Sequence, residues 1–330
     1  MQEWSDVDPR ALPAALRHSA EPVLLRGLVV HWPAVQAGRA GATEADAYLR
    51  RFWRDASVGV WWGPPEIGGR FFYDHDFSGF NFRRELMKLG PVLDALAHHA
   101  ADATPPALYV GSTTVDTCLP GFRDDNDLDF GDLQPLTSLW LGNRTRIAAH
   151  QDLPDNLACV VAGRRRFTLL PPDELPNLYV GPLDFTPAGQ AISLVDFAQP
   201  DLERHPKFAL ALQRAQTVEL GPGDALFVPS MWWHHVEALE PFNLLVNYWW
   251  RTTPAYMDSP MNALMLALLT LRDLPPHQRK VWQGVFDHYV FDAGEDTVAH
   301  IPPAARGVLA ALDDDGARML RAHLLKALNR

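Results

Sequence analysis

The sequence predicts a mainly β protein, with an antiparallel barrel or sandwich at its centre, an α/β region before it and helices after it. Short apolar runs separated by turn residues fill residues 108–252 and predict the central strands. Residues 1–107 mix helical and strand patterns and are expected to wrap the barrel, whereas residues 253–330 have helical periodicity. Within the central region, a Pro-rich insertion of little periodicity is expected at about 173–214.

Short elements of both kinds are predicted in the N-terminal region. Thr43 is the expected cap of one helix, because its hydroxyl can accept a backbone hydrogen bond and Asp46 follows in the first turn. Another helix is expected to break near its middle, at Gly90-Pro91. The helices are expected at 9–18, from 43 onward and at 84–99, and the strands at 22–27 and 69–73.

Many short strands are expected in the central region, and turn signals such as Gly142-Asn143 separate them. Short strands at such close spacing favour an antiparallel barrel or sandwich. The expected strands are 108–110, 137–141, 147–150, 157–161, 166–170, 217–220, 225–228, 235–239 and 242–250.

Helices are predicted after residue 253. Ser259-Pro260 is typical of a helix start, with Ser as the cap and Pro at the first helical position. The apolar stripe that follows is too short to span a membrane, so it either packs on the barrel or meets a second chain. Its members are Met261, Leu264, Met265, Leu268, Leu269 and Leu271. Two further helices are expected at 280–289 and 305–328.

Composition limits the classes of function. The chain has 330 residues, of which 47% are hydrophobic and 21% charged, enough for a large core. It has no uninterrupted apolar stretch of about 18 residues and no secretory signal at its start, so we expect a cytoplasmic protein without membrane association. Cys118 and Cys159 are too few for a disulfide framework and are expected to be free thiols. The net charge of −11 disfavours broad nucleic-acid binding.

The most informative motif is His150-Gln151-Asp152, at the end of an expected strand. Side chains two positions apart on a strand share a face, so His150 and Asp152 can point at one interior ion. A His near an acid is common, and Asp74-His75-Asp76 is a competing pair. The motif therefore needs a third ligand from elsewhere in the chain.

The third ligand is expected at His234 or His235. The turn at Gly223-Asp224 leads into a strand that ends at Pro229, and a hairpin of this kind can return the chain beside the His150 strand. Only one of two adjacent histidines faces inward on a strand, and alternation alone does not say which. Two imidazoles and one carboxylate hold one face of Fe(II) and leave the opposite face open, although zinc hydrolases also use such ligands.

Together these stretches resemble the Jumonji C family of Fe(II)- and 2-oxoglutarate-dependent oxygenases. The likeness is to its small cupin-like hydroxylase branch, which includes the asparaginyl hydroxylase of hypoxia-inducible factor. It runs from about residue 22 to residue 250 and is carried by specific motifs. They are His150-Gln151-Asp152 with Asn156, residues 162–167 with Pro171-Pro172, residues 229–237 and Val246-Asn247-Tyr248-Trp249.

The resemblance implies a double-stranded β-helix, that is, a cupin or jelly-roll barrel. It implies that His150, Asp152 and His234 are the catalytic Fe(II) ligands, and it leaves His235 as a structural residue. The implied reaction uses O2 and 2-oxoglutarate as co-substrates, releases succinate and hydroxylates a substrate carbon. A protein side chain is the expected substrate; a small molecule or an RNA nucleoside is the alternative, and lysine demethylation is less favoured.

By the same resemblance, five residues surround the co-substrate. Arg165 stands where relatives commonly have a Lys that binds the distal carboxylate, and a guanidinium can make two parallel bonds to that group. Tyr109, Asn156 and Asn247 are implied as hydrogen-bonding partners, with Trp249 next to them on the strand. A second departure is Ile147, at a position where relatives often have Thr or Ser.

Three alternatives accompany this interpretation. The barrel could be a non-catalytic binding protein or a zinc-dependent hydrolase or isomerase, and the third alternative concerns an acidic segment. Separately from these alternatives, the C-terminal helices are expected to allow a homodimer. The acidic segment 123–132 is expected to be a solvated turn, with a contact for a basic substrate as the alternative. The identity of the substrate is not readable from the sequence.

Overall fold

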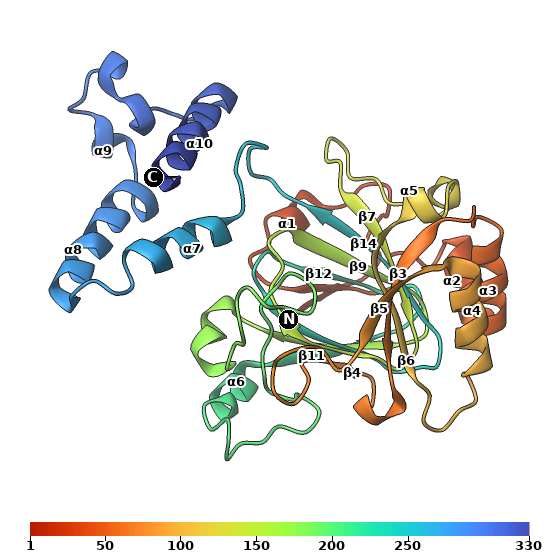
Figure 1. Ribbon diagram of the computed structural model, residues 1–330. Coiled ribbons are helices and arrows are strands. Elements are labelled where there is room, and N and C mark those ends of the chain that lie inside the picture. The colour runs from red at the N-terminus through yellow and green to blue at the C-terminus, as the bar shows by residue number, and fades with distance from the viewer. Residues whose placement is uncertain (330) are drawn as a thin grey trace. The chain divides into compact units, whose positions relative to one another are not determined.

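The computed structural model describes Met1–Asn329 and divides the chain into two compact units, which we describe separately (Figure 1). Unit 1 is Met1–Arg251 and unit 2 begins at Thr252. Among the described residues, no helix is long and apolar enough to cross a membrane. Both cysteines are buried free thiols, as predicted.

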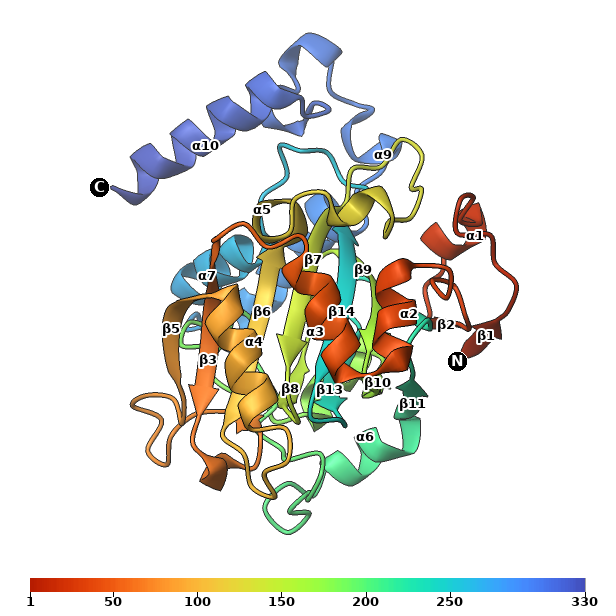
Figure 2. The same cartoon turned by 90° about the vertical axis from the view of Figure 1, so that its right-hand side faces the viewer.

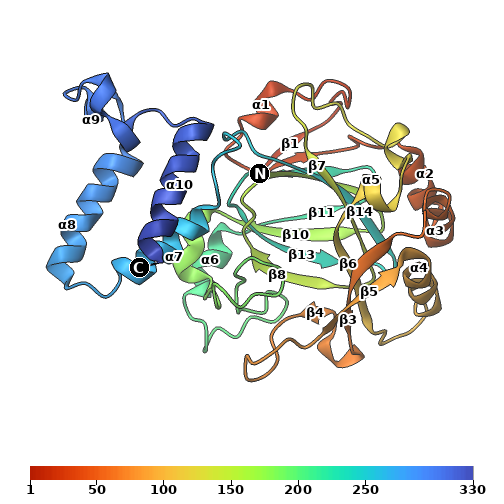
Figure 3. The same ribbon diagram turned by 45° about the horizontal axis from the view of Figure 1, so that its top comes forward.

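Unit 1 is built from two sheets, whose strands are named here in their order across each sheet. The larger sheet consists of β1 (Gln2–Trp4), β2 (Val23–Leu25), β12 (Ala225–Val228), β9 (Asp155–Ala162), β14 (Asn243–Trp250), β7 (Leu136–Gly142), β6 (Ala107–Thr114), β3 (Ser57–Gly63) and β5 (Arg83–Lys88). The smaller sheet consists of β11 (Gln216–Leu220), β10 (Arg165–Leu170), β13 (Trp233–Ala238), β8 (Arg146–His150) and β4 (Arg70–Phe71), and Figure 3 shows β10, β13 and β8 side by side.

The two sheets pack face to face, as alternation along the strands shows. On β9, Ala158 and Val160 point inward and join one apolar cluster with Phe167 and Leu169 of β10. All but two of the strand pairings are antiparallel, the exceptions being β1 with β2 and β4 with β8. This two-layer jelly-roll arrangement confirms the predicted fold class.

Three helices cover the outer face of the larger sheet (Figure 2). They are α2 (Pro33–Ala40), α3 (Ala42–Arg50) and α4 (Leu89–His98). Residues of β9 that alternate with the inward set, Cys159 and Val161, pack in one buried cluster with Val35 and Leu49 of these helices. The larger sheet is thus buried on both faces, which is why its central strands read as continuous apolar runs.

The central strands were predicted correctly, each to within a few residues at its ends. The N-terminal region was predicted less well. Residues 83–88 form β5 rather than the first half of a helix, and α4 begins at Leu89. Gly90-Pro91 therefore marks the first turn of a helix and not its middle, because a first-turn proline lacks only an N–H that would have no intrahelical partner.

Other N-terminal differences are local. Helix α3 begins at Ala42 after Gly41, so Thr43 lies inside the helix and does not cap it. The helix expected at 9–18 is limited to α1 (Ala14–Arg17), and α2 and β3 were not predicted. A short turn of helix, η1 (Pro65–Ile67), completes the region, and two more, α5 (Val115–Cys118) and η2 (Phe122–Asp124), follow β6.

The insertion at about 173–214 contains little regular structure, as expected. Its described helices are η3 (Pro172–Asn177) and α6 (Phe208–Arg214). Between them, Ile192 bridges to His150 in an antiparallel pair. Asp196 pairs with Arg146 of β8 at 3.1 Å, so the insertion is fastened along the smaller sheet.

Unit 2 is helical. Its segments are α7 (Pro260–Thr270), α8 (Pro276–Phe286), η4 (Asp287–Phe291), α9 (Glu295–Val298), η5 (Pro303–Ala305), η6 (Gly307–Leu309) and α10 (Asp314–Leu328). Ser259 caps α7 as predicted, its hydroxyl accepting from Met261 N at 3.3 Å. Few side chains are buried here: in the described part of unit 2, only Thr297 and Ala317.

Candidate metal centre

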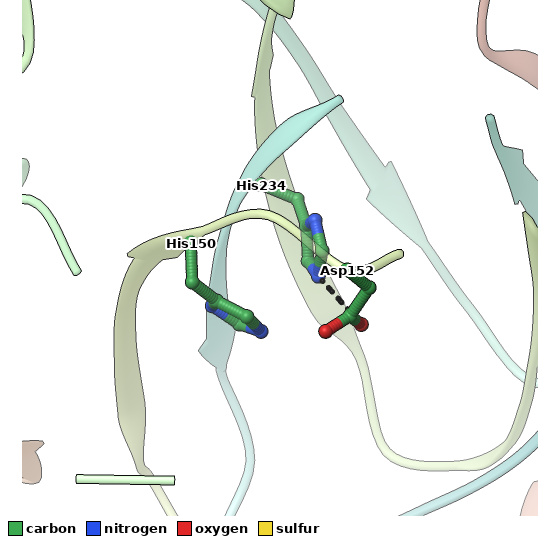
Figure 4. Close-up of side chains that lie close together, drawn as sticks. All are labelled: His150, Asp152 and His234. Carbon is green, nitrogen blue, oxygen red and sulfur yellow. Dashed lines mark ion pairs between the residues drawn. The ribbon is translucent and has the colours of Figure 1, made fainter. Parts of the chain in front are cut away.

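Two neighbouring strands bring the three predicted ligands together. His150 ends β8, Asp152 follows it, and His234 lies on β13 directly opposite His150 in the antiparallel register. A bulge between His234 and Val236 shifts the register just beyond that pair. One ligand atom from each of the three residues lies within 4.8 Å of the others, and their side chains converge in Figure 4.

Backbone contacts fix which nitrogen of each imidazole faces the cluster. His150 Nδ1 donates to Ala148 O at 2.9 Å, and His234 Nδ1 donates to Trp232 O at 3.0 Å. A carbonyl can only accept, so both Nδ1 atoms carry the proton when the rings are neutral. Both Nε2 lone pairs are therefore available to a metal, in the orientation that outer hydrogen bonds commonly enforce.

The charges of the three residues are coupled. Burial, together with the neighbouring His234, lowers the pKa of His150 to about 4. Burial alone would raise the pKa of Asp152, but the two imidazoles outweigh it and lower that pKa. Asp152 Oδ2 lies 3.5 Å from His234 Nε2, and against the effect of burial this carboxylate raises the pKa of His234. The cluster thus joins an ionised carboxylate to two imidazoles, the donor set of a divalent metal site.

His235 lies on the other face of β13. Its ring packs against Phe197 of the insertion, with the ring centroids 4.9 Å apart, and burial lowers its pKa to about 4. It is therefore an uncharged residue that supports the insertion. The structure brings His234, and not His235, to the other two ligands.

The loop before His234 is fastened to the segment that carries Asp152. Met231 N donates to Asp152 O at 2.9 Å, and Gln151 Nε2 donates to Met231 O at 2.6 Å. Ser230 Oγ donates to Leu153 O at 2.6 Å. Met231 adopts a left-handed conformation, with φ of 66°, which these bonds hold in place. These hydrogen bonds thus hold the backbone at Asp152 and the backbone just before His234 at a fixed spacing.

A cavity of about 390 Å³ opens beside the three ligands. It lies between the sheets, and every residue predicted for the site lines it. These are His150, Asp152 and His234, and also Tyr109, Asn156, Arg165, Asn247 and Trp249. Ile147, the predicted departure from the family pattern, lines it too.

Arg165 is a buried cation in this cavity. Its side chain is only 4% exposed, and burial lowers its pKa. Nη2 donates to Trp140 O at 3.3 Å, while Nε has no hydrogen-bond partner. No carboxylate of the described residues pairs with it. A buried guanidinium without an anionic partner is costly, so a negatively charged group bound beside Arg165 would stabilise it.

A polar array lines the opposite wall. Asn247 accepts from Trp140 Nε1 at 2.7 Å and donates to Asn156 Oδ1 at 3.0 Å. Trp249 packs edge-on against Trp140, with ring centroids 5.5 Å apart. Burial raises the pKa of Tyr109, so its hydroxyl stays protonated and can donate into the cavity. The two asparagines orient each other and fix the shape of this wall.

Sequence reasoning missed several lining residues. Trp61, Arg84 and Phe71 come from β3, β5 and β4, and Gln190 comes from the insertion. No motif marks them, and Arg84 was expected at the start of a helix rather than on a strand. Only the pairing of β5 beside β3 places Arg84 at the cavity.

Two other predicted features lie outside the metal centre. The pair Asp74-His75-Asp76 does not belong to the His–Asp–His group, and Asp74 accepts from Ser78 instead. In the acidic segment 123–132, Asp127 pairs with Arg123 at 2.7 Å and accepts from Tyr248 at 2.8 Å. Part of that segment is therefore structural rather than a solvated turn.

Comparison with known proteins identifies the family. The sequence pattern of the cupin-like domain matches residues 9–256, so the chain belongs to the cupin-like domain family. In its Jumonji C branch, this is a family of Fe(II)- and 2-oxoglutarate-dependent oxygenases.

Three relatives illustrate the range of the family. Lysine-specific demethylase JMJ31 of Arabidopsis thaliana is 35% identical over 140 residues, 39% of this chain and 25% of the relative. Jumonji C domain-containing protein 5 of Drosophila melanogaster is 29% identical over 70% of this chain and 55% of the relative. tRNA wybutosine-synthesizing protein 5 of Danio rerio is 36% identical over 32% of this chain and 29% of the relative. The matches thus span less than two thirds of each relative.

Proposed function

We propose that the chain is an Fe(II)- and 2-oxoglutarate-dependent dioxygenase that hydroxylates a side chain of a protein. The observation that carries the proposal is the sharing of one cavity by the His–Asp–His group and the unpaired, buried Arg165. A metal site alone would suit many reactions. A metal site with a buried cation beside it suits a co-substrate that has two carboxylates.

The residues fit the implied metal and co-substrate. His150 and His234 offer Nε2 and Asp152 offers a carboxylate oxygen, a set that leaves coordination positions open. With Fe(II), 2-oxoglutarate and O2 bound, such a site supplies oxidative decarboxylation and hydroxylation. The chain's own part is to hold the metal from one side, so that the other side faces the cavity.

Other residues position the co-substrate and keep water out. In this proposal Arg165 binds the distal carboxylate of 2-oxoglutarate, and the protonated Tyr109 adds a hydrogen bond, supported by the burial of both side chains in the cavity. Asn156 and Asn247 form a rigid polar wall, and Trp249 and Trp140 close the cavity on that side. The apolar Ile147 adds no hydrogen bond, so anchoring relies on Arg165.

A protein substrate is the leading candidate. The relatives' names include a lysine-specific demethylase and a tRNA-modifying protein, so related barrels serve both proteins and RNA. The net charge of −11 favours a protein over an RNA, which binds through clustered cations. A tRNA nucleoside is the second candidate, supported by the similarity to the tRNA wybutosine-synthesizing protein.

The test is Fe(II)-dependent conversion of 2-oxoglutarate to succinate by the purified chain, followed with and without a protein lysate. We expect turnover that Asp152→Ala abolishes. Tight zinc binding without any effect of 2-oxoglutarate on the metal's spectrum would favour a zinc enzyme instead. Binding of metal and 2-oxoglutarate without succinate would indicate a binding protein.

We further propose that unit 2 pairs two copies of the chain. Helix α7 is apolar on nearly every side, yet Leu264 is 44% exposed and Leu269 is 75% exposed. A helix that is apolar all round is normally buried. A second copy would cover these side chains.

A further inference from the structure

Arg84 is a second arginine of the cavity, separate from Arg165. It lies within β5, which is the outermost strand of the larger sheet, and it pairs with Trp61 of β3. Arg165 is buried, whereas Arg84 is exposed and lines the same cavity. One guanidinium is therefore enclosed by the cavity and the other lies where the cavity meets solvent.

The Arg84 guanidinium is held by aromatic rings and not by an acid. Its central carbon lies 5.3 Å from the ring centroid of Trp61, 5.4 Å from Phe80 and 5.8 Å from Phe82. Nη2 donates to Pro187 O of the insertion. No described carboxylate forms an ion pair with it, whereas the adjacent Arg83 pairs with Glu85 at 2.6 Å. Arg84 is thus oriented, and its charge remains available.

The co-substrate does not account for this second cation. This step rests on the proposed function: 2-oxoglutarate has one carboxylate for the metal and one distal carboxylate, and Arg165 is placed to bind the second. The two guanidiniums also differ in environment, because Arg84 is exposed and lies over the Trp61 ring, whereas Arg165 is buried. A further anion at Arg84 must therefore come from the substrate.

We propose that Arg84 is a specificity residue that binds an acidic side chain of a polypeptide substrate lying along the edge of β5. A strand at a sheet edge offers unpaired main-chain groups to an extended peptide. Leu86 follows Arg84 on the same face and is 81% exposed, so an apolar contact continues beside the cation. The cation also repels a methylated ammonium group, which argues against a methyl-lysine at this position.

The test measures binding of fluorescent peptide pools to the full chain, loaded anaerobically with Fe(II) and 2-oxoglutarate. One pool has Asp or Glu fixed at one position, a second has Asn or Gln there, and a third has Lys. We expect the wild-type chain to prefer the acidic pool. Arg84→Gln should weaken that preference by about tenfold, the scale of a hydrogen bond to a charged group.

Charge reversal separates recognition from a structural role. Arg84→Glu should transfer the preference to the Lys pool, which a merely misfolded variant would not do. Arg83→Gln is the matched control, because Arg83 is adjacent on β5, is already paired with Glu85 and lies over Trp62. It should keep the wild-type preference.

Several outcomes would overturn the proposal. One is equal binding of the three pools by the wild-type chain. Another is that Arg83→Gln loses as much preference for the acidic pool as Arg84→Gln does. A third is that Arg84→Gln weakens the binding of a single-stranded RNA and leaves the binding of all three peptide pools unchanged. Weaker 2-oxoglutarate binding by Arg84→Gln would place this residue in the co-substrate site instead. Succinate formation without peptide is scored separately, so failure of the oxygenase proposal is distinguishable from failure of this one.

Discussion

Unit 1 and unit 2 of this chain bury their apolar side chains very differently. In unit 1, helices cover one face of the larger sheet and the smaller sheet covers the other, so residues such as Phe227 and Val246 have no exposed surface. In unit 2, many of the described large apolar side chains are exposed, for example Phe291 at 73% and Met319 at 69%.

Apolar side chains form a buried core in unit 1, whereas in unit 2 many of them form an exposed surface. Unit 1 completes its own core, and all the predicted site residues lie in it. Unit 2 has regular helices with good start signals, but residues 252–329 contribute no side chain to a buried apolar cluster. Its apolar surface is the kind that marks a contact with another protein surface. We expect mutations of apolar or acidic residues to have large effects in unit 1 and small effects on a single chain in unit 2.

The largest expected effect is on chemistry in unit 1. Asp152→Ala removes one of three ligands and should lower Fe(II)-dependent succinate formation by more than about a hundredfold, the upper range for changes in the outer shell of a metal site. Asp292→Ala, at an exposed acid of unit 2, should leave the rate unchanged. Equal rates of succinate formation for Asp152→Ala and the wild type would show that this metal centre does not carry out the reaction.

The next effect concerns the stability of the two units. Phe227→Ala should lower the free energy of unfolding by about 3–5 kcal/mol, because the ring is buried and stacks on Trp250 at 5.8 Å. Phe291→Ala removes an exposed ring and should change the free energy of unfolding of a single chain by no more than about 0.5 kcal/mol. Urea unfolding measures both, and similar values would mean that the two units do not differ in packing.

A third expectation concerns assembly. Light scattering should give twice the chain mass of 36.9 kDa, and the double variant Leu264→Asp with Leu269→Asp should return the single-chain mass. Leu210→Asp is the control, because Leu210 is also exposed, at 53%, but lies on α6 of unit 1. A wild-type mass near 36.9 kDa would refute pairing through unit 2.

The smallest effect tests a local signal in unit 2. Ser259→Ala removes the cap of α7 and should cost about 1 kcal/mol, whereas Ser259→Gly should cost only a few tenths. Far-UV circular dichroism during urea unfolding can compare the two variants. Identical curves for both would show that packing, and not the cap, fixes the start of this helix.

The strands of the barrel and the three ligand candidates were accessible from the sequence for a physical reason. Buried strands are short apolar runs between turn residues, and both signals are local. The metal motif is local too, since two positions along a strand place His150 and Asp152 on one face. The choice of His234 came from resemblance, and the pairing of β13 with β8 then placed it opposite His150.

The errors arose where local signals are weak. Residues 83–88 lie at a sheet edge, are largely exposed and lack an apolar alternation, so nothing local distinguished a strand from a helix. Because residues 84–88 were expected to be helical, Pro91 was interpreted as a break inside that helix. In the structure β5 ends at Lys88 and α4 begins at Leu89, so Pro91 lies in the first turn. Helix α2 and strand β3 were missed as well, although the buried Val58 and Val60 alternate with exposed residues along β3 and are a local strand signal.

By itself, the sequence determined the class of fold, the ligand types of the metal centre and the presence of an apolar helical segment after the barrel. Those properties depend on residue type and on spacing within a few positions. Only the tertiary structure decided that Arg165 is buried without an anion and that Arg84 lies at the same cavity. Both facts depend on which distant strands pair, and a one-residue change of register would turn either side chain to the opposite face of its sheet.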